Sequence, residues 1–356
     1  MATWRDRRII DLFGIDAPII LAPMAGPGTP ELAIAVGEAG GLASLPCALL
    51  SVEQAREALT LIRSKTHAPV NLNFFCHTPP EADAARNLRW RARLAGYYVE
   101  HGIDPELTPA GAVRRPFDSD FCEVVEAFKP EVVSFHFGLP EKALFDRVKA
   151  TGAKIIASAT TVAEARWLEA HGCDAIIAMG LEAGGHRGTF LNHEMATQVG
   201  TFALVPQVAD AVSVPVIAAG GIADARGIVA ALALGASAVQ IGTAYLFCPE
   251  ARVPEVHRVA LRESSDDSTA VTNVFTGRPA RGIMNRVMRE VGPLSEAAPA
   301  FPLASAALAP LKAKAEEAGK GDFTSLWSGQ AARLAREMPA GEFTRVLIAE
   351  TLARLS

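Results

Sequence analysis

The sequence predicts an α/β protein built on a (β/α)₈ barrel, or TIM barrel, with an insertion after the third strand and a helical extension at the C-terminus. Three observations lead to this prediction. Eight short apolar runs are spread along the chain, most of them are apolar throughout rather than alternating, and the intervals between them hold helical patterns. Continuously apolar strands are typical of a parallel sheet that is covered on both faces. An open doubly wound sheet is the alternative architecture.

Most of the predicted strands end in Gly, Pro or Asn, or are followed by such residues. The strands cover residues 18–24, 41–46, 69–75, 132–138, 153–159, 174–180, 214–221 and 237–243. Helical patterns between them cover residues 29–40, 51–65, 141–152, 161–172 and 224–235. Several of these begin with Ser, Thr or Asp and end at Gly, which are common first and last residues of helices. The alternation of strand and helix therefore predicts a barrel that closes without free sheet edges.

The chain is longer than a plain barrel requires. A barrel of this kind takes about 250 residues, whereas the chain has 356. We predict a barrel domain over residues 1–250, including an insertion at about residues 76–130 beside the barrel mouth. The remaining residues, 251–356, are predicted to form a C-terminal helical extension that packs near the same mouth.

Composition narrows the classes of function. Half of the residues are hydrophobic and 21% are charged, which is too apolar for a disordered protein. The net charge of -5 gives no broad basic surface, so we expect no nucleic-acid partner. Neither a leader pattern nor a bilayer-length apolar stretch stands out, so we predict a cytoplasmic protein without membrane contact. The five cysteines are scattered without a CxxC pair, and neither disulfides nor a metal site is expected.

The residues that follow the seventh and eighth predicted strands are unusually small. Gly220 and Gly221 close the seventh strand, and Gly242 and Thr243 close the eighth. In such a barrel the active site lies at the carboxyl ends of the strands, and these two loops form the usual phosphate site. Glycine lets backbone amides approach an anion closely, and a helix N-terminus adds favourable partial charge. We therefore predict a phosphate site here, with tight turns that serve geometry alone as the alternative.

Two further strand ends suit a flat aromatic ligand such as a flavin ring. Pro23, Met24 and Ala25 follow the first strand, where backbone groups rather than ionic side chains would face the ligand. Asn71 and Asn73 occupy alternate positions of the third strand, so both side chains point to one face, and buried amides need hydrogen-bond partners. A ribityl chain or a ring carbonyl would supply these partners, and neighbouring backbone groups are the alternative.

The stretch MGLEAGGHRGTF, residues 179–190, places a histidine between glycines directly after the sixth predicted strand. The glycines would give a second molecule close access to the imidazole, which titrates near neutral pH. His186 is therefore the predicted catalytic residue, and the alternative is a histidine that only orders its loop. His136, in the fourth strand, is the nearest rival, and the neighbouring Arg187 would attract an anion or be solvated.

Several segments, taken in order, resemble the class I nitronate monooxygenases, formerly called nitropropane dioxygenases. They are PMAGPGTPELAIAVGEAGGLASL, PVNLNFF, GLEAGGHRGTF, VIAAGGIAD, AVQIGTAYL, FTGRPARGIMNRVMRE and DFTSLWSGQAARL. The resemblance covers nearly the whole chain and implies a TIM barrel that carries non-covalently bound FMN, with His186 at the substrate. The matching positions imply FMN contacts from Asn71, Gly184, Gly221, Gln240, Ile241, Gly242 and Thr243.

Some residues depart from the family pattern or leave a role open. Met179 stands where many relatives carry Gln, so a hydrogen bond expected from that side chain to the cofactor is missing. Tyrosine occurs only three times, so any phenol in the substrate pocket must come from Tyr97, Tyr98 or Tyr245. Taken without the resemblance, the two arginines of FTGRPARG, residues 278 and 281, would be a surface ion-pair group after a turn.

The resemblance implies oxidation of nitronates, either propionate nitronate or alkyl nitronates, by O₂ to a carbonyl compound and nitrite. The expected route passes through a flavin semiquinone and needs no nicotinamide cofactor. Two alternatives share the glycine motifs. One is an NAD(P)H-dependent flavin reductase of the quinone or enoyl reductase type, and the other is a non-catalytic flavin-binding protein. Apolar helical surface is compatible with a homodimer.

Overall fold

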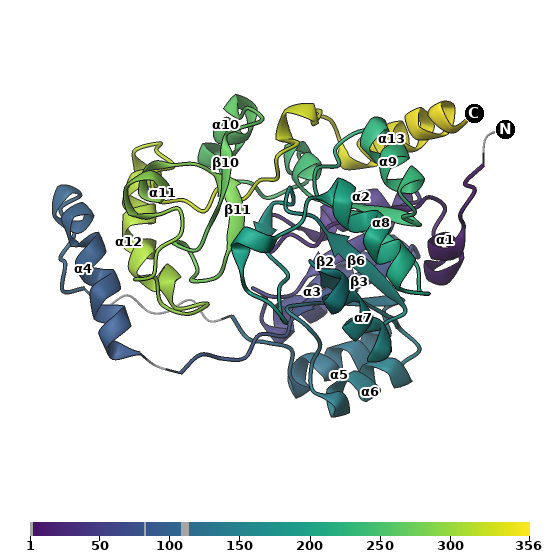
Figure 1. Ribbon diagram of the computed structural model, residues 1–356, viewed down its shortest axis with the longest axis horizontal. Coiled ribbons are helices and arrows are strands. Elements are labelled where there is room, and N and C mark those ends of the chain that lie inside the picture. The colour runs from purple at the N-terminus through teal and green to yellow at the C-terminus, as the bar shows by residue number, and fades with distance from the viewer. Residues whose placement is uncertain (1–2, 82, 108–113) are drawn as a thin grey trace.

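Eight parallel strands form a barrel in the computed structural model, which describes residues 3–81, 83–107 and 114–356. Around the sheet the order is β1 (Ile19–Leu21), β9 (Ala238–Ile241), β8 (Val216–Ala219), β6 (Ala175–Met179), β5 (Lys154–Ala159), β4 (Val132–His136), β3 (Val70–Phe75) and β2 (Ala43–Pro46). A parallel bridge between Ile20 and Leu42 brings β2 back to β1. The predicted TIM barrel is thus confirmed (Figure 1).

A ring of helices covers the outside of the barrel. Its members along the chain are α2 (Pro30–Glu38), α3 (Val52–Lys65), α5 (Ser119–Phe128), α6 (Lys142–Ala150), α7 (Val162–Ala170), α8 (Thr201–Ala211) and α9 (Ala225–Ala233). Their starts follow local chemistry: Ser51 caps α3 in a reciprocal capping box with Gln54. The last helix, α13 (Ala340–Leu355), packs against α2 and α9 and completes this ring.

The inside of the barrel changes character along its axis. Towards the start of the strands it is apolar, with Ile20, Leu42 and Ile217 packed in one cluster with Ile9 and Phe13 of α1 (Arg8–Phe13). Towards the carboxyl ends it carries polar side chains from several strands, which are Asn73, His136, Ser158 and Gln240. Of these four, Gln240 has a buried side-chain oxygen without a hydrogen-bond partner, which leaves an acceptor available to a ligand at this end of the barrel.

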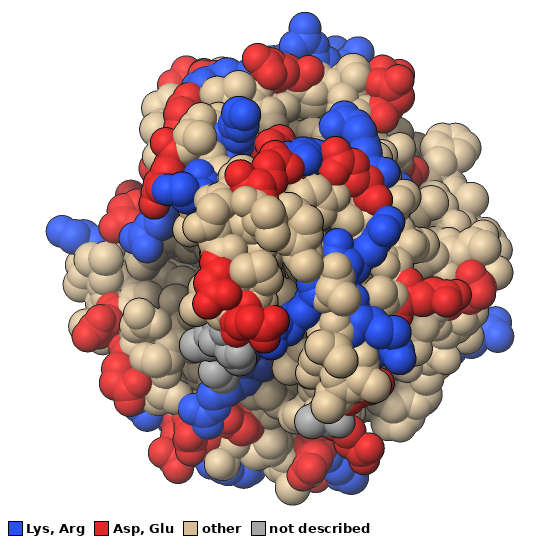
Figure 2. All heavy atoms as spheres, turned by 90° about the vertical axis from the view of Figure 1, so that its left-hand side faces the viewer, with Lys and Arg blue, Asp and Glu red and all other residues tan. Residues whose placement is uncertain are grey.

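The insertion packs on the C-terminal segment and forms a small lobe with it. Its helix α4 (Ala84–Glu100) lies against α12 (Ala304–Glu317), set apart from the barrel in Figure 1. The indole nitrogen of Trp90 donates to the carbonyl of Ala304 at 3.1 Å, and the Tyr98 hydroxyl donates to the carbonyl of Ala307 at 2.6 Å. Figure 2 shows the face of the molecule that carries this lobe, where acidic and basic side chains are interspersed.

The C-terminal segment is helical only in part. Besides α10 (Glu255–Glu263), α11 (Arg286–Val291), α12 and α13 it contains the antiparallel strands β10 (Thr269–Thr272) and β11 (Ala280–Ile283). Strand β11 also pairs with β7 (Gly185–His186), which follows β6. Short 3₁₀ turns complete the fold: η1 (Met195–Thr197), η2 (Thr243–Phe247) and η3 (Ala332–Leu334).

The domain limits stay a prediction. Because α13 belongs to the ring of barrel helices, its contacts favour a barrel domain that takes in this helix, rather than one that ends at residue 250. In the described ranges, the structure contains no helix with both the length and the apolar character needed to cross a membrane.

Candidate active site

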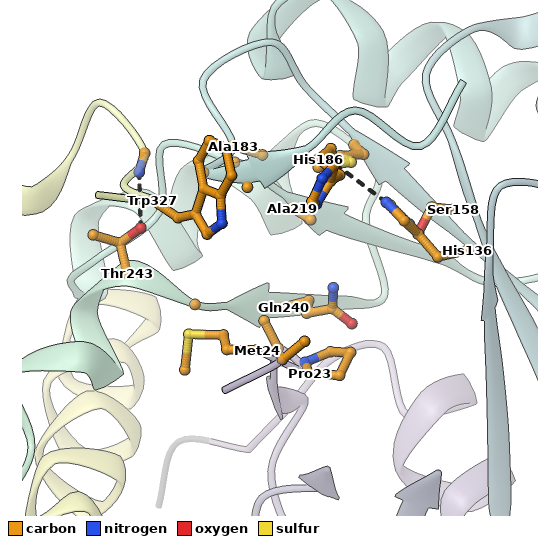
Figure 3. Close-up of a pocket in the computed structure, with 18 of the residues that line it drawn as sticks. Pro23, Met24, His136, Ser158, Ala183, His186, Ala219, Gln240, Thr243 and Trp327 are labelled. Atoms are coloured by element: carbon orange, nitrogen blue, oxygen red, sulfur yellow. Dashed lines mark hydrogen bonds between the residues drawn. The ribbon is translucent and has the colours of Figure 1, made fainter. Parts of the chain in front are cut away.

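A cavity opens at the carboxyl ends of the barrel strands and is covered in part by residues 327–331 of the C-terminal segment (Figure 3). Most of the predicted site residues line it. These are Pro23, Met24, Ala25, Met179, Gly184, His186, Gly220, Gly221, Gln240, Gly242 and Thr243. They come from the ends of β1, β6, β8 and β9 and from the loops that follow. Four separate stretches of sequence therefore meet in one place, as the barrel topology requires.

Two predicted cofactor contacts, Asn71 and Ile241, do not line the cavity. Both are fully buried. The Asn71 amide nitrogen donates to the Ser44 hydroxyl at 3.0 Å, whereas its side-chain oxygen is buried without a hydrogen-bond partner. Asn73, two residues later on the same strand face, lines the cavity instead and donates to the Ser134 hydroxyl at 3.0 Å.

His186 is held by the C-terminal segment as well as by its own loop. Its Nε2 lies 2.9 Å from the Thr276 hydroxyl oxygen, and the main chain of β7 pairs with β11. Burial lowers the pKa of His186 well below its usual 6.5, and the charges of Arg114 and Arg278 act in the same direction. The imidazole is therefore neutral near pH 7, with one ring nitrogen in the unprotonated form.

The rival histidine, His136, has both ring nitrogens engaged. Its Nε2 lies 3.2 Å from the carbonyl oxygen of His186 and its Nδ1 lies 3.0 Å from the Ser158 hydroxyl. Since a carbonyl only accepts, Nε2 carries the proton and Nδ1 accepts from the serine. Burial lowers the pKa of His136 to about 3. His136 thus supports the loop that carries His186 and has no nitrogen free to exchange a proton with a substrate.

Arg187 fixes the loop that carries His186 through hydrogen bonds, and it is not exposed to bind an anion. The guanidinium is fully buried and donates to the carbonyls of Gly180 at 2.7 Å and Met179 at 2.8 Å. It also donates to the Gln198 side-chain oxygen at 3.0 Å. Burial lowers its pKa to about 10, which leaves it charged at neutral pH. The residue next to His186 therefore ties the loop to the end of β6.

The end of β8 has a backbone shape that suits an anion. Gly220 and Gly221 have φ values of +110° and +72°, which residues with a side chain rarely adopt. A Cβ at Gly220 would lie 2.9 Å from the backbone nitrogen of Ala183. Nearby, the side-chain oxygen of Gln240 is buried without a hydrogen-bond partner, and its amide projects into the space between Met24 and His186 in Figure 3. A glycine cradle beside an unsatisfied amide fits a phosphate-bearing ligand with polar ring atoms, as a flavin mononucleotide has.

Gly184 serves a close backbone approach in addition to lining the cavity. A Cβ there would lie 2.5 Å from the backbone nitrogen of Gly329. That nitrogen donates to the Thr243 hydroxyl at 2.9 Å, so the segment around Gly329 is pinned to the end of β9 (Figure 3). Gly184 thus allows the C-terminal segment to close over the barrel.

The sequence reasoning missed several cavity residues. Trp327 is one, and its ring centroid lies 5.4 Å from that of His186. The only signal for it was the resemblance of DFTSLWSGQAARL, which assigned no role to any residue. Others include Phe75, Arg114, Ser158, Glu182 and His257. None of the three tyrosines lines the cavity, because Tyr97 and Tyr98 belong to the small lobe and the Tyr245 hydroxyl is 2.8 Å from that of Thr344.

The FTGRPARG segment is structural support for the site rather than a surface ion-pair group. The Arg278 guanidinium lies 3.8 Å from the Phe137 ring centroid and donates to the carbonyl of Thr189. Arg281 is buried and donates to the carbonyl of Leu181 at 2.9 Å. Neither arginine makes a salt bridge within residues 3–81, 83–107 and 114–356. The same residues contain no cluster of His, Cys, Asp or Glu arranged to hold a metal ion.

Comparison with known proteins settles the family. The family model described as nitronate monooxygenase matches residues 6–350. The chain belongs to the nitronate monooxygenase family. This is a family of oxidoreductases that are in general flavin-dependent.

Similar proteins include a named nitronate monooxygenase and two proteins of solved structure. Nitronate monooxygenase of Pseudomonas aeruginosa is 41% identical over 345 residues, which are 96% of this chain and 98% of that protein. A nitroalkane oxidase from Streptomyces ansochromogenes has a TM-score of 0.88 and 38% identity, covering 98% of each chain. FabK from Thermotoga maritima has a TM-score of 0.72 and 30% identity, covering 99% of this chain and 98% of its own.

Proposed function

We propose that the protein oxidises nitronates with O₂ to a carbonyl compound and nitrite, using non-covalently bound FMN. Membership of the nitronate monooxygenase family supports this reaction. The observation that carries the proposal is that His186, neutral by burial, lies in one cavity with the glycine cradle of Gly220 and Gly221. A proton acceptor and a phosphate cradle are therefore available to one bound cofactor and one small substrate.

The residues present suit FMN. Gly220, Gly221 and the main chain of Gly242 and Thr243 would hold the phosphate, next to the N-terminus of α9. Pro23 and Met24 would lie against the ring, and the unsatisfied amide of Gln240 would hydrogen-bond it. FMN supplies the redox chemistry when bound, whereas the protein supplies binding, orientation and electrostatics. Met179 lines the same cavity with a thioether, which offers no strong hydrogen bond to the ring.

His186 has two tasks in this proposal. Because Nε2 is bonded to the Thr276 hydroxyl, Nδ1 is the nitrogen left for the substrate. As Nδ1–H it donates to the nitro group of a nitronate, and in the other tautomer it accepts the α-proton when a neutral nitroalkane is offered instead. Because its pKa is lowered, it needs no prior deprotonation at neutral pH. The Thr276 hydroxyl orients the ring through Nε2, and the aromatic rings of Trp327 and Phe301, centred 5.4 Å and 5.3 Å away, limit the access of water.

The test is the initial rate of O₂ consumption and nitrite release with propionate nitronate, with nitroethane and with NADH. We expect nitronate turnover without NADH. The variant His186→Asn should lower turnover of nitroethane by roughly 100-fold or more, the usual contribution of a general base. His193→Asn is the matched control, because His193 is exposed in the same loop and contacts the Thr189 hydroxyl. Full nitroethane turnover in His186→Asn would remove the residue from the mechanism.

An NAD(P)H-dependent flavin reductase is the second candidate, because the glycines at the ends of β8 and β9 would hold the phosphate of a flavin equally well in such an enzyme. NADH oxidation in the absence of nitronate would favour it. Bound flavin that reacts with neither nitronate nor NADH would favour a non-catalytic flavin-binding protein. The homodimer and the cytoplasmic location stay predictions.

A further inference from the structure

The cavity carries an arginine that has no partner for its charge. Arg114 lines the cavity, and its Nε is buried without a hydrogen bond. The described residues provide no salt bridge to it, whereas the neighbouring Arg115 pairs with Asp118 and Asp120. Burial lowers the pKa of Arg114 from its usual value, although a guanidinium stays charged at neutral pH. A buried charge without a counter-charge is unfavourable unless a bound ligand of opposite charge neutralises it.

The one carboxylate among the described cavity-lining residues is already engaged elsewhere. Glu182 accepts hydrogen bonds from the backbone nitrogen of Thr201 at 2.8 Å and from its hydroxyl at 2.9 Å. Thr201 begins α8, so Glu182 caps that helix and interacts with its dipole. Its side chain also borders Gly221, at the phosphate end of the cavity. Glu182 therefore does not neutralise Arg114.

Arg114 is placed near His186, across a shared aromatic ring. Its guanidinium carbon is 5.4 Å from the Phe301 ring centroid, and the His186 ring is 5.3 Å from the same centroid. After burial, the Arg114 charge is the largest of the influences that lower the pKa of His186. Arg278 differs, because it does not line the cavity and its guanidinium is used on Phe137 and on the Thr189 carbonyl.

We propose that Arg114 binds a carboxylate carried by the substrate, beside the nitronate group held at His186. This inference rests on the proposed function. A guanidinium matches a carboxylate with two parallel hydrogen bonds, and charge-assisted bonds are the strong ones. Arg114 then determines specificity: it favours nitronates with an anionic tail over plain alkyl nitronates of similar length.

The kinetic test compares propionate nitronate with the nitronate of 1-nitropropane in wild type and Arg114→Met. Loss of a hydrogen-bonded charge should lower kcat/KM for propionate nitronate by roughly 10- to 100-fold. The alkyl nitronate should change by less than about threefold, because it has no carboxylate for the guanidinium to bind. Arg115→Met is the matched control and should leave both values unchanged. Equal loss for the two substrates, or no loss, overturns the assignment.

A binding test separates this inference from the reaction itself. Calorimetric titration of the flavin-loaded protein with propionate should show binding that is lost in Arg114→Met and weakened in Arg114→Lys, which keeps the charge but not the two-pronged geometry. Neutral propionamide should bind neither protein. Unchanged flavin absorption in the variants shows that they fold. If no nitronate is turned over, the proposed function fails, yet loss of propionate binding in Arg114→Met still supports the anion site. Failure of propionate to bind the wild type overturns it.

Discussion

Lowering the pH from 8 to 5 should destabilise the protein by about 2 kcal/mol through His136 alone. Its pKa is about 3 in the fully buried site, against 6.5 for the free group. Because the folded-state pKa is the lower one, the contribution to stability is complete above pH 6.5 and is lost as the pH falls towards 3. At pH 5 the unfolded chain has taken up nearly the whole proton and the folded chain almost none of it. The unfolded-state pKa of 6.5 lies about 1.5 units above pH 5. At about 1.4 kcal/mol per unit, this lowers the free energy of unfolding by about 2 kcal/mol.

The assay is the free energy of unfolding in urea at pH 8 and pH 5, for wild type and for His136→Gln. The glutamine amide offers a donor and an acceptor, as the imidazole does to the His186 carbonyl and the Ser158 hydroxyl, but it does not titrate. The variant should be less stable at pH 8, yet its loss between the two pH values should be about 2 kcal/mol smaller. Exposed His67→Gln serves as the control and should follow the wild type. The same acid loss in wild type and His136→Gln would refute the reasoning.

Three further variants test the supports of the site. Thr276→Val removes the hydrogen bond to His186 Nε2, worth about 1 kcal/mol, and should lower kcat/KM for nitroethane about fivefold; an unchanged value would mean that the hydroxyl does not orient the ring. Gly220→Ala, at φ +110°, should weaken FMN affinity at least about tenfold in a fluorescence titration. The control is Gly152→Ala, at φ +91° with open space around it, which should retain FMN. Equal FMN affinity in the Gly220 and Gly152 variants would refute the phosphate site proposed at Gly220. Arg187→Met removes the guanidinium hydrogen bonds to the carbonyls of Gly180 and Met179, of which the Gly180 carbonyl keeps a backbone donor from Ala183, and should destabilise the protein by about 2 kcal/mol in urea. Wild-type stability of this variant would contradict the supporting role of Arg187.

The barrel and the glycine strand ends were predictable because they depend on local pattern. Buried parallel strands need continuous apolar runs, and those runs are visible in the sequence. Positions at strand ends follow from the topology. The sequence therefore predicts that His186, Gly220 and Gln240 lie at the same end of the barrel, where they line one cavity. Asn71 lies outside the cavity lining, with a buried side-chain oxygen that has no hydrogen-bond partner, and its contact with the cofactor stays a prediction. A period of two residues tells which face a side chain takes, but not how far along the barrel axis it lies.

The elements of the C-terminal segment that lie over the cavity were harder to predict, because their positions depend on contacts between segments far apart in the sequence. Trp327 and Thr276 reach His186 only after the C-terminal segment folds back over the barrel. The strands β10 and β11 are four residues each and contain Ala, Gly and Thr, so their composition does not distinguish them from loop. The final helix joins the barrel ring after an excursion of nearly a hundred residues, and only its packing against α2 and α9 reveals this.

The most direct test of the central claim is an anaerobic titration of the purified protein with propionate nitronate, followed through its visible absorption. We predict a yellow protein with oxidised-flavin bands that the nitronate diminishes without any NADH. Bands that persist with nitronate and disappear only with NADH would contradict nitronate oxidation and favour a reductase. A colourless preparation that takes up no FMN would contradict the cofactor as well.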